Sequence, residues 1–327
     1  MTTGAADPHP SGYQTPEALW TAVNDRIRRR VAADPLLTVS NLQRQFVYDR
    51  LLCRVFDGDD DRWVLKGGTA LLARVRSARH SQDVDLFRQA GTVDAAVAEL
   101  RQAAARDQKD HFRFVTRLDS VRQQRPGQPG TQVATVKVEG YAGVRQVAMF
   151  SVDIVVGSVI TAEPEPMRPV PVVAVAGLPS PDYRLYPLVD HIADKLCATF
   201  ERFGAAQAPS SRVRDLVDLV VIARTQTVHA AGLHQAIEAE QTHRRLPAFG
   251  RFATPPRWAN TYPAQARNVA LCEGYRTHPQ AVELVGQFLD PVLSGALSAG
   301  TWLPEQQRWA AVSEEGLPLS SAAGGVR

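Results

Sequence analysis

Two short motifs in the first third of this 327-residue chain carry the residue types that could do chemistry. The first consists of Lys66, Gly67, Gly68 and Thr69 and follows the apolar run Trp63-Val64-Leu65. The apolar run predicts a buried strand, and the glycines allow a tight turn into a helix that Thr69 would cap. A helix that begins here directs free backbone N–H groups at whatever lies before it. Such a helix start favours an anion, for example a phosphate.

The second motif, Asp83-Val84-Asp85-Leu86-Phe87, places two carboxylates two positions apart. In a strand, residues i and i+2 project from the same face, so Asp83 and Asp85 would lie side by side. They would repel each other unless they are solvated or share a cation. Mg²⁺ is the natural cation because it takes oxygen ligands and keeps positions for substrate phosphates. The two motifs in this order, with Lys66 before the glycines, predict a metal-dependent site that handles nucleotides.

Each motif alone has an ordinary structural explanation. Gly-Gly-Thr is often a simple turn, and Asp-x-Asp is often a solvated strand edge. The P-loop pattern and the dinucleotide-binding pattern G-x-G-x-x-G are both absent here, so neither of those nucleotide sites is predicted.

The elements that must position these motifs are strands. Residues 111–118 and 131–139 alternate in polarity with period two and predict an antiparallel hairpin with one buried face. The next predicted strand, residues 147–156, is largely apolar but contains Asp153. A charge in a buried strand is costly unless it is paired or binds a metal. Asp153 is therefore either a strand-end residue that caps a loop or a third carboxylate of the metal site, and we favour the third carboxylate.

The segment L-K-G-G-T-A-L followed by S-Q-D-V-D-L resembles the AbiEii/AbiGii family of nucleotidyltransferase-like toxins, which includes the MenT-type toxins. That family belongs to the polymerase-β-like nucleotidyltransferase superfamily. Two further segments are similar to the family: A-D-K-L at 193–196, and R-V-R-D-L-V-D-L at 212–219, where Arg214 stands in a place often taken by lysine. The resemblance covers residues 46–225 and implies that Lys195 and Asp215 are catalytic, together with Asp83 and Asp85.

The resemblance also implies a fold and a division of the chain. The expected fold is α+β, with a mixed-sheet minimal nucleotidyltransferase core followed by a mainly helical C-terminal part that completes the active site. We expect this core with its N-terminal helices at residues 16–178 and the helical part at 179–312. Residues 1–15 are expected to be disordered and residues 313–327 to be a flexible tail.

The roles implied by the resemblance are those of nucleotidyl transfer. Asp83 and Asp85, with Asp153 as a further metal ligand, would hold one or two Mg²⁺ ions. The nucleotide-binding residues would be Lys66, Gly67, Gly68, Thr69 and Ser81. The donor would be an NTP such as CTP, and the acceptor would be the 3′ end of tRNA, so that aminoacylation and translation stop. A cognate antitoxin would be the protein partner.

Composition limits the remaining possibilities. The formal net charge is only +3, so any nucleic-acid site must be a local patch. The three cysteines match no zinc spacing, and their odd number argues against a disulfide framework, which favours a reducing cytoplasm. No signal peptide and no membrane-spanning run is expected. Two stretches could hold RNA, the arginine-rich segment 26–30 and the aromatic–arginine segment 247–263, although each is also typical of a solvated or packed surface.

Several alternatives stay open. The acceptor could be a protein or a small molecule, the reaction could be phosphoryl transfer, or the chain could be a non-catalytic nucleotide-binding module. The donor base, the oligomeric state, the antitoxin's mode of action and the role of residues 226–327 do not follow from the sequence.

Overall fold

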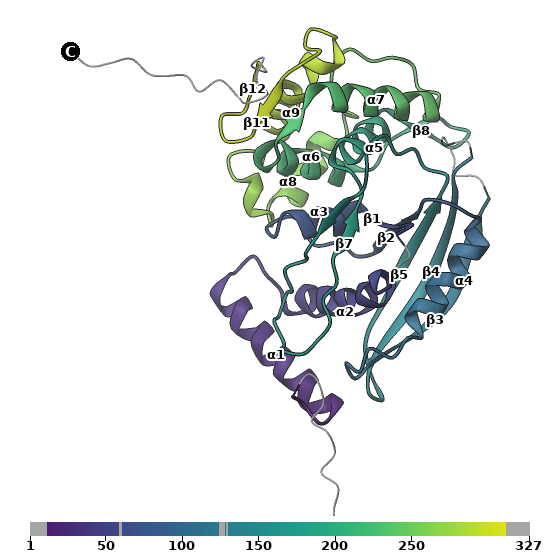
Figure 1. The fold of residues 1–327 in the computed structure, drawn as a ribbon. Coiled ribbons are helices and arrows are strands. Elements are labelled where there is room, and N and C mark those ends of the chain that lie inside the picture. The colour runs from purple at the N-terminus through teal and green to yellow at the C-terminus, as the bar shows by residue number, and fades with distance from the viewer. Residues whose placement is uncertain (1–11, 59–60, 124–127, 129, 312–327) are drawn as a thin grey trace, which may run out of the picture.

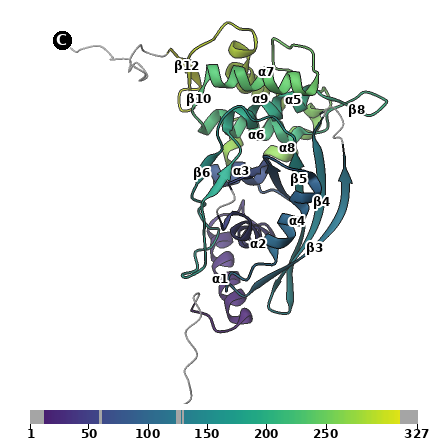
Figure 2. The same ribbon diagram turned by 45° about the vertical axis from the view of Figure 1, so that its right-hand side comes forward.

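The computed structural model describes residues 12–58, 61–123, 128 and 130–311. The tail expected at 313–327 lies outside the described residues, as does most of the N-terminal segment 1–15. The described chain forms a seven-stranded mixed sheet and a mainly helical part that lies over one end of it (Figures 1 and 2). The expected α+β class, with a mixed sheet first and helices after it, is confirmed.

The sheet has the spatial order β3-β4-β5-β2-β1-β7-β6. Its central pair, β1 and β2, is antiparallel, and β2 continues in parallel to β5. The predicted hairpin and the strand after it are confirmed as the antiparallel run β3-β4-β5. In chain order the strands are β1 (Trp63–Lys66), β2 (Val84–Arg88), β3 (Phe112–Arg122), β4 (Gln132–Ala142), β5 (Arg145–Val156), β6 (Glu165–Met167) and β7 (Tyr183–Leu185).

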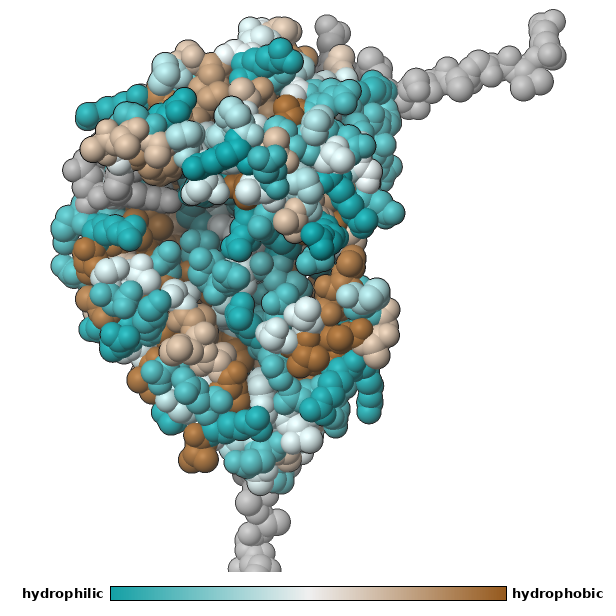
Figure 3. All heavy atoms as spheres, turned by 180° about the vertical axis from the view of Figure 1, so that it is seen from behind, coloured by the Kyte–Doolittle hydropathy of each residue, from teal (hydrophilic) through white to brown (hydrophobic). Residues whose placement is uncertain are grey.

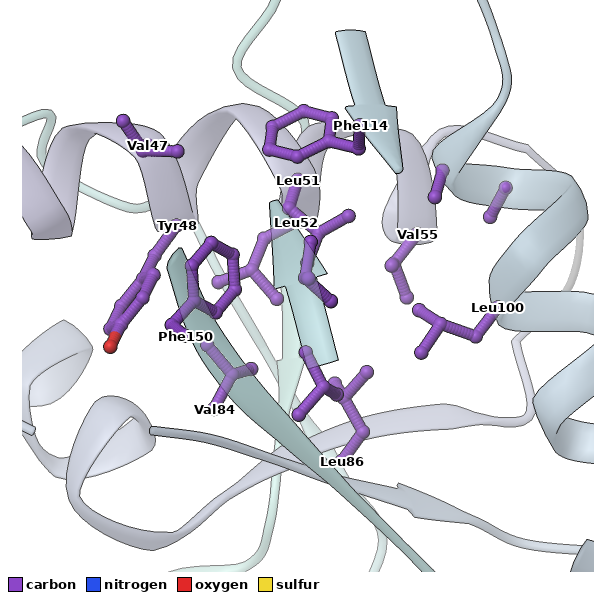
Figure 4. Packing of buried hydrophobic residues seen from close by; sticks show 14 of the residues in the cluster. Val47, Tyr48, Leu51, Leu52, Val55, Val84, Leu86, Leu100, Phe114 and Phe150 are labelled. Atoms are coloured by element: carbon purple, nitrogen blue, oxygen red, sulfur yellow. The ribbon is translucent and has the colours of Figure 1, made fainter. Parts of the chain in front are cut away.

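Three helices cover one face of this sheet: α1 (Pro16–Ala33), α2 (Val39–Phe56) and α4 (Val93–Ala104). In α1, Thr15 accepts a hydrogen bond from the first turn and Pro16 occupies its first position, as the sequence predicts. Figure 4 shows the packing beneath α2, where Leu51 and Leu52 meet side chains of the sheet such as Val84 and Leu86. This apolar layer holds the strands in place, and it therefore also fixes the positions of the polar residues on the opposite face of the sheet.

The helical part has its own core. It contains α5 (Leu188–Phe200), α6 (Val213–Thr225), α7 (Ala230–Arg244), α8 (Trp258–Ala266), the 3₁₀ turn η1 (Ala270–Cys272) and α9 (His278–Leu293). Short strands complete it: β8 (Arg202–Phe203), β9 (Ala208–Pro209), β10 (Val228–His229), β11 (Thr301–Leu303) and β12 (Arg308–Ala310). Residues 216–223 of α6 are all buried, so this helix is the centre of the part.

Helix α3 (Gly67–Arg74) joins the two cores. Its Ala70 packs with the sheet residues, whereas Leu71 and Leu72 pack with the helical part. Strand β7 pairs with β1 and ends at Leu185, beyond the expected boundary after residue 178. The chain enters the helical part only with α5, directly after this strand.

The aromatic–arginine stretch is structural. Trp258 and Tyr262 are 1% and 0% exposed, and Trp258 Nε1 donates to the carbonyl of Ser210 at 2.8 Å. Phe249 stacks on Phe200 with ring centroids 3.9 Å apart. These rings are packed within the protein, so the idea that they stack on RNA bases is wrong. No helix in the described part of the chain is both long and apolar enough to span a membrane.

A buried ion pair ties α2 to β3. Arg54 is 0% exposed and binds both carboxylate oxygens of Asp110, at 2.9 and 2.7 Å. It also donates to the carbonyls of Arg106 and Phe112, at 3.0 and 2.8 Å. All of the charge of Asp110 is therefore compensated by one side chain.

We predict that Arg54→Met lowers the free energy of unfolding by about 3–5 kcal/mol, because it leaves Asp110 buried without a counter-charge. Urea denaturation followed by tryptophan fluorescence measures this change. The matched control is Arg28→Met, which breaks an exposed pair with Asp25 on α1 and should cost less than about 1 kcal/mol. Equal losses in the two variants would contradict the role given to Arg54.

Candidate active site

The turn between β1 and α3 is built around a close approach. Gly67 has φ +63°, a left-handed conformation that favours glycine. A Cβ placed on Gly67 would lie 1.8 Å from Oδ2 of Asp85. No side chain fits there, so the carboxylate of Asp85 lies directly against the backbone of the turn. The predicted strand–glycine–helix geometry is thus present, with the backbone N–H groups of the first turn of α3 at the same place.

Asp83 is held by the two hydroxyls that the motifs supply. Ser81 Oγ donates to Asp83 Oδ1 at 2.8 Å, and Thr69 Oγ1 donates to the carbonyl oxygen of Asp83 at 3.0 Å. The expectation that Thr69 caps α3 is wrong, because the helix begins at Gly67 and Lys66 occupies the cap position. The glycines allow the helix to start three residues earlier, with the cap at Lys66 and not at Thr69, which leaves Thr69 to tie α3 to the aspartate motif.

Asp153 lies beside Asp85. The parallel register of β2 and β5 pairs these two residues, so both side chains project from the same face. Thr135, opposite Asp153 on β4, donates to Asp153 Oδ1 at 2.7 Å. The described residues contain no group of three or more His, Cys, Asp or Glu side chains that could hold a metal ion. Two carboxylates with substrate phosphates are nevertheless a usual Mg²⁺ donor set, so Asp83 and Asp85 fit this ion.

Lys195 and Asp215 meet in a buried ion cluster of the helical part. Lys195 Nζ lies 3.2 Å from Asp215 Oδ1 and 2.6 Å from Asp218 Oδ2. Arg212 Nε donates to Asp215 Oδ2 at 2.6 Å. Arg79 binds both oxygens of Asp218 at 2.8 Å. The side chains of Lys195, Asp215 and Asp218 are at most 5% exposed, so these contacts are shielded from water.

Arg79 connects this cluster to the nucleotide turn. It lies in the loop between α3 and β2, two residues before Ser81. A Cβ on Gly68 would lie 3.2 Å from one guanidinium nitrogen of Arg79 and 3.1 Å from Ser81 Oγ. The guanidinium therefore covers the start of α3 on one side and holds Asp218 on the other.

The cluster keeps its charges at neutral pH. Burial would lower the pKa of Lys195, but the carboxylates of Asp218 and Asp215 outweigh burial and raise that pKa. Burial would likewise raise the pKa of Asp215, but Arg212 and Lys195 hold it below its ordinary value. Lys195 is therefore a fixed cation, kept in place by two carboxylates.

Lys66 is the other cation near the turn. Its Nζ lies 4.0 Å from the ring centroid of Tyr186 and 3.5 Å from Ser158 Oγ. It is 7% exposed, so the ammonium is held beneath the surface on an aromatic face.

The site lies where the two parts of the chain meet. The structure gathers Gly67, Gly68, Ser81, Asp83 and Asp85 at the turn, and Arg79 links them to Lys195 and Asp215. Seen from behind, the molecule is hollowed near its middle, and the lining there is mainly hydrophilic (Figure 3). A cleft of about 420 Å³ beside this loop is lined by Gln82 and by Arg30, Arg76, Arg79 and Arg214.

Sequence reasoning did not identify Arg79, Asp218 and Thr135 as site residues. Asp218 stands three residues after Asp215 in the segment 212–219. In a helix this spacing places the two carboxylates on the same face, and it could have identified Asp218 as a neighbour of Asp215. Arg79 is a single arginine in a loop, and such a residue is normally solvated. Thr135 is opposite Asp153 only because of the strand register.

The Asp85 carboxylate set against a glycine turn at a helix start suits a site where a metal ion and a nucleotide phosphate meet. A family model described as the nucleotidyl transferase AbiEii toxin of type IV toxin–antitoxin systems matches residues 50–284. The match extends well beyond residue 225 into the helical part. The chain belongs to this AbiEii nucleotidyltransferase toxin family, and it is an enzyme of that class.

One solved structure supports the fold. The chain is similar to MenT4, a nucleotidyltransferase toxin from Mycobacterium tuberculosis H37Rv, with a TM-score of 0.50 and 15% identity over 83% of this chain and 98% of that one. It is also similar to JHP933 from Helicobacter pylori, with a TM-score of 0.42 and 15% identity over 80% of this chain and 94% of that one. None of the curated proteins matches the sequence significantly.

We predict that Gly67→Ala lowers nucleotidyl transfer by at least about 100-fold, because the new methyl group displaces the Asp85 carboxylate. Expression of the variant should therefore no longer inhibit growth. The matched control is Gly204→Ala, where φ is +68° but no atom lies within 4 Å of the added Cβ. It carries the same backbone strain and should remain toxic. Full toxicity of Gly67→Ala at equal expression would contradict the close approach.

A second prediction concerns pH. The lowered pKa of Asp215 contributes stability above 3.8 that is lost as pH falls through the folded value, and the raised pKa of Lys195 contributes stability below 10.5 that is lost as pH rises. The difference in unfolding free energy between wild type and Asp215→Asn should therefore stay constant from about pH 5 to about pH 9. Denaturant titrations at each pH measure it. A difference that already disappears between these limits would show that the cluster does not hold its charges.

Proposed function

We propose that this enzyme uses Mg²⁺ to transfer NMP from an NTP, with CTP as the first donor to test, to the 3′ end of tRNA. The transfer would block aminoacylation and translation in the cytoplasm and so inhibit growth. The observation that carries the reaction is the carboxylate of Asp85 lying against the Gly67 turn at the start of α3. A helix start that accepts phosphate and a carboxylate pair that accepts Mg²⁺ then share one space.

The donor would be held by the turn and by the cations around it. Backbone N–H groups at the start of α3 would receive the triphosphate, with Gly67 and Gly68 allowing close approach. Lys66, buried at the edge of the turn, would add positive charge. Thr69 and Ser81 would act through Asp83, since both hydroxyls already donate to that residue.

Asp83 and Asp85 would hold the metal, and Asp153, paired with Asp85 across β2 and β5, would join them as a third ligand only once the ion is bound. When bound, Mg²⁺ would neutralise the phosphate charges and lower the barrier to attack on the α-phosphate. Ser81 fixes one oxygen of Asp83 and Thr135 fixes one oxygen of Asp153, so neither carboxylate has to be ordered during the reaction.

Lys195 would neutralise charge that develops on the phosphates, and Asp215 would position it. The side chain of Lys195 is already held by two carboxylates, so it loses no further conformational entropy when the donor binds. Ser81 also offers a point of control. A phosphate added to its hydroxyl would place negative charge beside Asp83, which should inhibit the enzyme.

A cognate antitoxin is the partner expected from family membership, because toxins of this family act within toxin–antitoxin systems.

The proposal is tested by incubating the protein with tRNA, Mg²⁺ and each α-³²P-labelled NTP in turn. Label on tRNA with one preferred NTP is the expected result, and Asp85→Asn should lower its rate by at least about 100-fold. The matched control is Asp182→Asn, an exposed aspartate on the loop before β7, which should keep the full rate.

Other outcomes identify the alternatives. Label from γ-³²P-labelled NTP in place of α-³²P-labelled NTP would show phosphoryl transfer. Label on a protein or a small molecule in an extract, with none on tRNA, would show that this molecule, and not tRNA, is the acceptor. Growth inhibition that is unchanged in Asp85→Asn would contradict catalysis and favour a nucleotide-binding module.

A further inference from the structure

One face of the long strands β3, β4 and β5 is open to solvent. Helices α1, α2 and α4 cover the opposite face. On the open face Val115 and Met149 are 44% and 68% exposed. This open face is continuous with the carboxylates, because β5 pairs with β2.

The register arranges the open face in rows. One row contains Asp85, Asp153 and Thr135, which are paired across β2, β5 and β4. The next row lies two residues further along the strands, or about 7 Å away. It contains Ser151 of β5, Lys137 of β4 and Arg117 of β3. A row of basic side chains therefore lies directly beside the row that contains the catalytic carboxylates.

The two rows beyond it continue the surface. Val115, Glu139 and Met149 are paired across the strands, and the last row brings Arg113 opposite Tyr141. The guanidinium of Arg113 lies 4.0 Å above the Tyr141 ring, and the Tyr141 hydroxyl donates to Glu139 at 2.6 Å. Glu139 accepts this hydrogen bond, and a second acid, the exposed Asp119, lies two residues after Arg117 on β3. Arg117 forms no ion pair or hydrogen bond among the described residues.

Strand order separates the donor from the acceptor. The donor turn lies on β1 and α3, on one side of Asp85, and Asp153 lies on the other side. In-line transfer requires the attacking hydroxyl and the leaving pyrophosphate on opposite sides of the α-phosphate. With the pyrophosphate towards α3, the hydroxyl must come from the side of Asp153, which is the side where β5, β4 and β3 continue.

We propose that the open face of β3–β5 holds the single-stranded 3′ end of an RNA acceptor and leads its terminal hydroxyl to Asp153 and Asp85. This inference rests on the proposed function and assigns a surface to its acceptor. Lys137 and Arg117 contact backbone phosphates next to the reacting nucleotide. Tyr141, with Arg113 stacked on it, and Met149 offer flat or adaptable surfaces for unpaired bases.

The surface fits a nucleic acid better than a protein. Its three basic residues, Arg113, Arg117 and Lys137, follow the strands towards the carboxylates and offer contacts to a polyanion. Its exposed apolar side chains are single and lie between polar rows, whereas the core of a protein interface gathers apolar side chains into one patch. A flat sheet carrying aromatic and basic side chains is also a form in which single-stranded RNA is bound.

The test uses a fluorescein-labelled single-stranded RNA that ends in CCA, with anisotropy measured in the Asp85→Asn background so that no transfer occurs. Arg117→Glu and Lys137→Glu should each raise the Kd at least about fivefold and reduce the dependence of binding on salt. The matched control is Arg101→Glu, an exposed arginine on α4 behind the sheet, which should leave the Kd unchanged. In the active enzyme the same two variants should raise the KM for tRNA and leave the KM for the NTP as it is.

Binding that is equal in Arg117→Glu, Lys137→Glu and Arg101→Glu would overturn the inference, as would a wild-type protein that does not bind the RNA. If tRNA is labelled and these variants keep the wild-type KM for tRNA, the proposed function stands and this surface is wrong. If tRNA is not labelled but the two variants weaken RNA binding selectively, the surface stands and the RNA acceptor is not tRNA.

Discussion

The contact between the Asp85 carboxylate and the backbone of Gly67 is the constraint on which the site depends. An atom as small as Cβ does not fit between them, so the turn has to be glycine and the carboxylate has to face it. The contact lies at the end of the antiparallel pairing of β1 with β2, where Lys66 is opposite Asp85. It also places a negative group at a helix start, where the helix dipole stabilises it and where a metal ion can be shared with a substrate phosphate.

The second constraint is the buried ion cluster between the two parts of the chain. Buried charges are expensive unless each has partners with good geometry. Here Arg79, from the loop that leads to the aspartates, holds Asp218, and Asp218 with Asp215 holds Lys195. The cluster therefore does more than neutralise itself, because it fixes the helical part relative to the nucleotide turn. Helix α3, which packs into both cores, reinforces the same junction.

Local sequence signals predicted the elements near the motifs, because strands and turns here follow from short-range pattern. The hairpin β3–β4, the strand with Asp153 and the glycine turn are where polarity and glycine placement indicated. The predictions were wrong where tertiary contacts determine the role of a side chain. Thr69 bonds to Asp83 instead of capping α3, and Trp258 and Tyr262 pack into a helical core that the stretch 247–263 alone does not reveal. Thr135 contacts Asp153 only because of the register between β4 and β5, and Arg79 contacts Asp218 only because the helical part packs against the sheet. A single sequence does not reveal either of these arrangements.

The central claim is that one site, formed by both parts of the chain, binds the donor at the Gly67 turn. A crystal structure of the protein with Mn²⁺ and an NTP analogue that cannot be cleaved between the α- and β-phosphates tests it most directly. The account predicts an anomalous peak for Mn²⁺ at Asp83 and Asp85, with the triphosphate on the backbone of Gly67 and Gly68 and on the side of Lys195. A metal bound elsewhere, or a triphosphate away from the start of α3, would contradict it.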